Sequence, residues 1–153
     1  MLFRSYTLTS QTAAQKLFNT STNGAITLPT GFFEFECFFT LSAMSSTSGS
    51  FGFALAGSAT YTQIWTSVAG KTTAGANSIF GSYNTSANPA LTSSSVATTG
   101  YAIIKGTLRV TVGGTVIPQG SLNVAAAAVV GAGSYFKVTQ IANTSTQTIG
   151  NWS

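Results

Sequence analysis

Apolar and polar residues alternate along much of the chain, and this pattern predicts β-strands. From residue 33 to 43 every second position is apolar or small, while Glu34 and Glu36 lie among the positions between them. A period of two places these sets on opposite faces of an extended strand. Phe32 and Phe38 make the second face partly apolar. The segment therefore predicts a long strand with one fully apolar face.

The same alternation recurs along the rest of the sequence. It is seen at residues 51–55 and 61–68, again at 101–112, and at 134–141. Thr, Val, Ile, Phe and Tyr are plentiful and suit a pleated surface, whereas strong helix formers are rare. The alanines at 125–128 could favour a helix, but flanking valines and following glycines indicate small residues at a crowded packing site. We expect the inner faces to include Phe33, Phe35, Phe39, Leu41, Phe53, Leu108 and Val110.

Turn residues separate these strands at short intervals. Gly113-Gly114 predicts a two-residue hairpin, because glycine adopts positive φ at little cost. Pro118 should end the next strand or lie at a sheet edge, because proline has no N–H to donate. The polar loops 45–50 and 83–95 are too short to link domains. The sequence thus predicts one all-β domain over residues 1–153, a sandwich or barrel, with residues 1–15 as an extended arm or first strand.

Charged residues are scarce, at 5% of the chain against about 25% in an average globular domain. The basic pI of about 9.5 follows from having only two acids. The six cations are spread along the sequence rather than clustered, so we expect no nucleic-acid partner. The longest strongly apolar run, residues 124–130, is far short of the roughly 20 needed to span a bilayer. The first fifteen residues also show no signal peptide, so synthesis in a cytoplasm and no membrane partner are expected.

Side chains that carry chemistry are few. Glu34 and Glu36 are the only acids, and on a strand they would lie about 7 Å apart on one surface rather than across a cleft, as glycoside hydrolysis requires. Lys105 and Arg109 also share one strand face. The sequence therefore favours cross-strand ion pairs among these four residues over catalysis.

Other reactive groups are equally limited. Cys37 is the only cysteine, lies on the apolar face and has no histidine anywhere in the chain to act as its base, which predicts a buried, inert thiol. No metal site or cofactor is expected, since thiolate clusters and imidazoles are lacking. Trp65, Tyr83 and Trp152 are either sugar-stacking platforms or packing residues in the core or between subunits; the sequence favours packing. The chain is thus not expected to be an enzyme.

Sparse surface charge has a second consequence. A protein with so few charges risks low solubility as a monomer, and an open sandwich has sheet edges to protect. Both problems diminish when identical neighbours or a larger assembly cover the surface. The composition thus indicates an obligate oligomer.

Several segments, in order, carry a family resemblance that covers about residues 27–136. They are LPTGFFEFE at 28–36, FGFALAGSAT at 51–60, IKGTLRV at 104–110, GGTVIPQ at 113–119 and GAGSYFKVT at 131–139. This series resembles virion proteins of tailed bacteriophages that carry a small trimeric jelly-roll domain. The domain is of the tumour-necrosis-factor and complement-globular-head type.

The resemblance implies a fold, a location and partners. The fold would be a single jelly-roll β-sandwich that forms a homotrimer, with Tyr135 and Phe136 near the threefold axis. The function would be that of a capsid decoration (cement) protein, made in the cytoplasm of the host bacterium, that bridges major capsid proteins on the virion surface. The alternative is a trimeric tail-fibre or spike tip that binds a host receptor or glycan. The absence of heptads or a shaft-anchoring segment favours decoration, and residues 1–15 would be the arm that reaches a neighbour.

Overall fold

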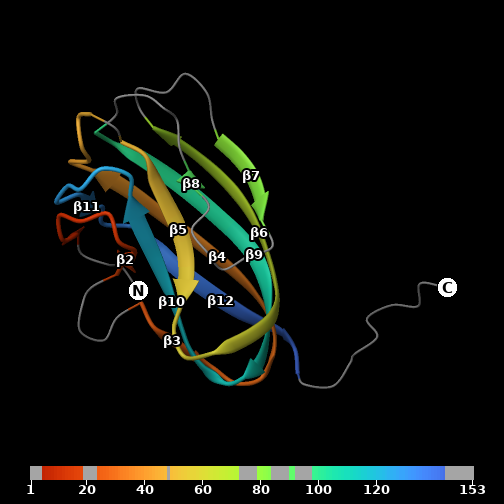
Figure 1. Cartoon of the computed structure of the whole chain (residues 1–153). Coiled ribbons are helices and arrows are strands. Elements are labelled where there is room, and N and C mark those ends of the chain that lie inside the picture. The colour runs from red at the N-terminus through yellow and green to blue at the C-terminus, as the bar shows by residue number, and fades with distance from the viewer. Residues whose placement is uncertain are drawn as a thin grey trace.

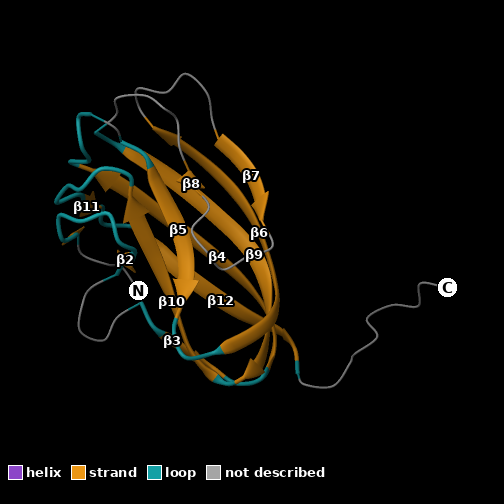
Figure 2. Cartoon of the chain, in the orientation of Figure 1, coloured by secondary structure: helices purple, strands orange, loops and turns teal. Residues whose placement is uncertain are grey.

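The computed structural model describes residues 5–18, 24–47, 49–72, 79–83, 90–91 and 98–143. Within these ranges every regular element is a β-strand and every strand pair is antiparallel. Figures 1 and 2 show two layers of strands packed face to face. The all-β prediction is confirmed in this β-sandwich-like arrangement. No helix in the described ranges is long and apolar enough to cross a membrane.

The larger sheet has seven strands in the order β1-β11-β4-β9-β6-β7, and β12 also pairs with β4. β11 and β12 lie along one edge of β4, and β9 lies along the other. Residues 131–134 separate β11 from β12 with a turn in which the Ser134 hydroxyl donates to the Gly131 carbonyl and accepts from the Thr40 N–H. The bounds are β1 Tyr6–Thr7, β4 Gly31–Ser42, β6 Thr60–Thr72, β7 Ile79–Tyr83, β9 Gly100–Val112, β11 Val129–Val130 and β12 Tyr135–Ala142.

The smaller sheet has five strands in which β10 is central. β5 pairs along one edge of β10, and the short strands β2 and β3 pair along the other. β8 continues the sheet beyond β5. The bounds are β2 Gln15–Lys16, β3 Ile26–Leu28, β5 Phe51–Ala56, β8 Ala90–Leu91 and β10 Gly114–Leu122.

One apolar core fills the space between the sheets. All seven residues expected on the inner faces are buried, and so is Cys37. Phe39 of β4 is fully buried, and its ring lies 5.6 Å from that of Phe51 and 6.4 Å from that of Phe53, both on β5. The Phe-rich strand thus joins the two layers through aromatic contacts, as its alternation predicted.

The hairpin predicted at Gly113-Gly114 is wrong. β9 belongs to the larger sheet and β10 to the smaller one, and the two strands do not pair. The chain crosses between layers here, as it also does from β3 to β4 and from β5 to β6. Neither glycine has positive φ; a Cβ at Gly114 would lie 2.6 Å from the Ala59 backbone nitrogen. Close approach at a corner, rather than turn conformation, is therefore why glycine stands at this position.

Hydrogen bonds hold two of these crossings together. The Ser58 N–H donates to Thr115 Oγ1 at 3.1 Å, and the Thr115 N–H donates to Ser58 Oγ at 3.0 Å. The Ala59 N–H donates to the Thr115 carbonyl at 3.0 Å. The β5–β6 corner is thereby fixed to the start of β10.

Pro118 does not end its strand, so of the two expected positions only the sheet edge remains. It lies in the middle of β10, opposite Leu55 of β5. Its carbonyl accepts from the Leu17 N–H, so its nitrogen faces the same edge, in the interval between β3 and β2. The missing N–H therefore removes no hydrogen bond from the β5–β10 ladder.

The described part of the N-terminal segment packs on the chain's own body. Tyr6 and Thr7 form β1 against β11, and Gln15 begins β2 against β10. Leu8 and Leu17 are buried in the core. The described residues 5–15 thus lie against the two sheets of this same chain. The alanines at 125–128 are not helical, and only Ala128 among them is buried.

Candidate functional site

The outer face of the larger sheet brings together most of the polar residues singled out by the sequence. Cross-strand register places Thr139, Glu34, Thr107 and Trp65 in one row across β12, β4, β9 and β6. The next row holds Lys137, Glu36, Lys105, Ser67 and Ser82. Directly opposed residues point to the same side of a sheet, so both rows project from the outer face.

Glu36 is the most constrained polar group on this face. Lys105 Nζ lies 2.9 Å from Glu36 Oε2, and the Tyr135 hydroxyl donates to Glu36 Oε1. The hydrogen bond from Lys105, then that from Tyr135, holds the pKa of Glu36 below its ordinary value of 4.5. The hydrogen bond to Glu36 in turn raises the pKa of Tyr135. Glu36 is therefore ionised at neutral pH.

The structure contains one of the expected cross-strand ion pairs, Glu36–Lys105. Glu34 lies opposite Thr107 and Thr139, and Arg109 lies opposite Phe32 and Gln63, so register separates these two charges from each other. Within the described ranges neither makes an ion pair.

Three of the six cations that are spread along the sequence come together on this face. Lys105, Lys137 and Arg109 all project from this outer face. Glu34 and Glu36 lie among them, which leaves these five charges with a sum of only +1. The face is therefore mixed in sign rather than a basic stripe.

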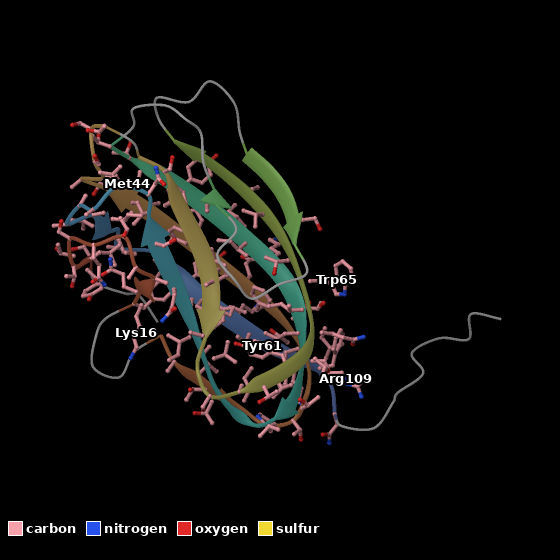
Figure 3. All side chains as sticks on the ribbon, in the orientation of Figure 1. Lys16, Met44, Tyr61, Trp65 and Arg109 are labelled. Carbon is pink, nitrogen blue, oxygen red and sulfur yellow. The ribbon has the colours of Figure 1, made fainter. Side chains whose placement is uncertain are left out.

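A shallow groove of about 450 Å³ runs across these two rows. Phe35, Thr66 and Gly106 contribute to its lining, with Glu34, Glu36, Trp65, Ser67, Ser82, Lys105, Thr107, Lys137 and Thr139. Trp65 is 59% exposed, and Figure 3 shows its indole projecting away from the sheet, on the same side as Arg109. Trp65 is thus an exposed aromatic group beside hydroxyl, carboxylate and ammonium groups, rather than a core residue.

Gly106 of β9 permits close packing against β6 and the core beneath this groove. A Cβ there would lie 2.2 Å from the Trp65 carbonyl oxygen and 2.7 Å from the Phe35 ring. Because Phe35 is buried, its ring approaches the backbone of β9 from the core side. Because Gly106 has no side chain, the Phe35 ring can pack against the backbone of β9, the strand that carries Lys105 and Thr107.

Tyr135 and Phe136 lie on opposite faces of β12. Tyr135 is 36% exposed, and its ring lies 5.9 Å from that of Phe38 on the outer face. Phe136 packs against the core, with its ring 6.3 Å from that of Phe35. Consecutive strand residues point in opposite directions, so one outer surface cannot present both side chains. Of the two, Tyr135 is the more exposed.

The remaining candidates add no chemistry to this face. Burial raises the pKa of the Cys37 thiol, which keeps it protonated inside the core. No group of three potential metal ligands occurs in the described part of the chain. Trp152 and the side chain of Tyr83 lie outside the described residues.

The row that contains Trp65 and Glu34 was not apparent from the sequence, because it depends on which strands are neighbours. The Glu-rich alternation at 33–43 and the alternation around Trp65 each indicated a strand face, but not their shared row.

Comparison with protein-family models, curated proteins and solved structures finds no match for this chain.

Proposed function

We propose that this chain is a non-enzymatic capsid decoration protein of a tailed bacteriophage. In this proposal the domain is a jelly roll, three copies form a trimer, and each trimer bridges neighbouring major capsid proteins on the virion surface. The observation that carries an assembly role is the apolar belt on the outer face of the larger sheet. It consists of Tyr135, Phe38, Ile103, Ala69 and Tyr101.

The belt is continuous and lies open in the single chain. Register places Tyr135, Phe38, Ile103 and Ala69 in one row across four strands, with Tyr101 in the next position along β9. Tyr101 is 40% exposed, and Phe38 and Ile103 are only half-buried. Apolar patches of this kind are typical of surfaces that other protein molecules cover, and aromatic residues are enriched there.

Bridging would stabilise a shell through many modest contacts. Once one copy of a trimer is bound, its neighbours bind at a high effective concentration, so release requires several contacts to break together. Separation of capsid subunits then becomes less favourable wherever a trimer spans their boundary.

The state of the reactive groups supports a binding role over a catalytic one. Glu36, ionised and engaged by Lys105 and Tyr135, is poorly suited to act as a general acid, which needs a raised pKa. Cys37 is buried as a thiol.

Quantitative mass spectrometry of purified virions tests the location. Hundreds of copies per particle, normalised to the major capsid protein, are expected for a protein of the shell lattice. A few to a few dozen copies would instead favour the tail-fibre or spike tip, and absence from the particle would exclude both. Light scattering of the purified chain should give three times the mass of 15.7 kDa. The Phe38→Asp variant, which places a charge in the apolar belt, should shift this mass towards that of the monomer.

A further inference from the structure

We propose that the groove beside Trp65 binds a neutral oligosaccharide. This inference goes beyond the decoration role, because it concerns a different part of the outer face and a different class of ligand. The apolar belt lies in the row beyond Glu36 and Lys105, whereas Trp65 lies on the opposite side of that row.

The first argument is the position of the indole. Trp65 is the most exposed of the large hydrophobic side chains described, yet it stands beside polar residues rather than within the apolar belt. An aromatic face stacks well on the apolar face of a pyranose ring, while the ring's hydroxyls point outwards to polar partners. An indole with hydroxyl and carboxylate groups beside it provides both kinds of contact.

The second argument is the set of hydrogen-bonding groups. Thr107, Glu34 and Thr139 follow Trp65 across the sheet in one row. Four strands spaced about 4.8 Å apart make this row about 14 Å long. The carboxylate is an acceptor, and the two hydroxyls both donate and accept, which suits a series of sugar hydroxyls. A row of this length favours a short chain of sugars over a single one.

The third argument concerns charge. Glu36 is already paired with Lys105 and accepts a hydrogen bond from Tyr135. Glu34 is therefore the carboxylate that is more available to a ligand. Two glutamates in the lining disfavour a phosphodiester backbone, and the two lysines offset them. The lining charges sum to zero, which favours a neutral glycan over nucleic acid or a strongly acidic polysaccharide.

The shape of the groove supports the same ligand class. It lies open on a sheet surface, and its lining is dominated by polar side chains. A small apolar ligand would stay largely in contact with water there, whereas a sugar chain keeps its outward hydroxyls hydrated without loss. The groove therefore fits an extended, well-hydrated ligand.

Intrinsic fluorescence gives a direct test, because the chain has two tryptophans. In the Trp152→Phe variant, Trp65 is the only tryptophan reporter. The probes are the pentamers of β-1,4-linked glucose, α-1,4-linked glucose and β-1,4-linked N-acetylglucosamine, together with a printed array of neutral bacterial polysaccharides. Stacking on Trp65 should shift its emission to shorter wavelength in a saturable manner, with little dependence on salt.

Variants then assign the site by calorimetry with the best probe. Trp65→Ala should weaken binding at least tenfold, and Glu34→Gln should weaken it several-fold. Val112→Ala is the matched control, because it shortens an apolar side chain that is 58% exposed and lies outside both the groove and the apolar belt, and it should leave affinity unchanged. Circular dichroism verifies that each variant is folded.

Three outcomes would overturn the inference. They are the absence of binding to every probe, equal losses for Trp65→Ala and Val112→Ala, or binding that added salt abolishes. The decoration role is judged separately by copy number on the virion. Particles with normal copies of a Trp65→Ala protein that no longer binds saccharide would support both proposals as independent properties.

Discussion

Replacement of Phe39 by alanine should remove a large part of the stability of the fold. Phe39 is fully buried, and its ring packs against those of Phe51 and Phe53 of the opposite sheet, at 5.6 and 6.4 Å. Truncation of a buried Phe typically costs about 3–5 kcal/mol, through lost burial and the cavity that remains. The whole free energy of unfolding of a domain is about 5–15 kcal/mol. A loss near 4 kcal/mol would thus remove between roughly a quarter and most of the free energy of unfolding.

The neighbouring Phe38 provides a matched control. It is the same residue type on the same strand, but it points to the outer face and is half-buried against the Tyr135 ring. Phe38→Ala should cost only about 1 kcal/mol, the value of one exposed aromatic pair. The contrast between the two variants therefore measures the difference between the inner and outer faces of β4.

Urea denaturation followed by far-UV circular dichroism gives both values. With an m-value near 2 kcal/mol/M, Phe39→Ala should lower the midpoint by roughly 2 M and Phe38→Ala by roughly 0.5 M. The corresponding shift in Tm for Phe39→Ala is about 8–16 °C. Both variants should be measured at two protein concentrations, because subunit association would add a concentration-dependent cost to Phe38→Ala. Equal losses for the two variants at the lower concentration would refute the assignment of inner and outer faces.

Three further predictions concern the site and its supports. Glu36 has a lowered pKa in the folded chain, so its contribution to stability is present above pH 4.5 and is lost as pH falls through the folded value. Between pH 6 and pH 3 the free energy of unfolding should decline less for Glu36→Gln than for the wild type. The difference should be no more than about 1 kcal/mol, because the Glu36–Lys105 pair is partly exposed. Identical pH profiles for the variant and the wild type would argue against the pair. Gly106→Ala should lower stability by about 1–3 kcal/mol, since the new Cβ would overlap the Trp65 carbonyl and the Phe35 ring. Gly70→Ala is the control, because the atom nearest to its new Cβ would be 3.0 Å away. In thermal melts of the two variants, Gly70→Ala should lower Tm less than Gly106→Ala. The Cys37 thiol should fail to react with a disulfide reagent in the native protein and react fully in urea, because burial both hides it and raises its pKa; rapid native labelling would contradict the buried position.

The core of the fold could be predicted from the sequence because alternation is a local property. A strand with Phe33, Phe35, Cys37 and Phe39 on one side must bury that side, whatever strands lie beside it. The opposite orientations of Tyr135 and Phe136 on β12 follow from the same rule. The small number of acids and the lack of histidine likewise limit the chemistry without reference to any fold.

Strand order and the candidate site were decided by tertiary structure. Gly113-Gly114 has the sequence of a hairpin turn, but β10 lies in the other sheet. At this corner the backbone of Gly114 passes close to that of Ala59, which a side chain at position 114 would prevent. Trp65, Thr107, Glu34 and Thr139 come from four strands far apart in sequence, and only the register of β6, β9, β4 and β12 aligns them. Periodicity determines which face a residue occupies, whereas long-range pairing determines its neighbours on that face.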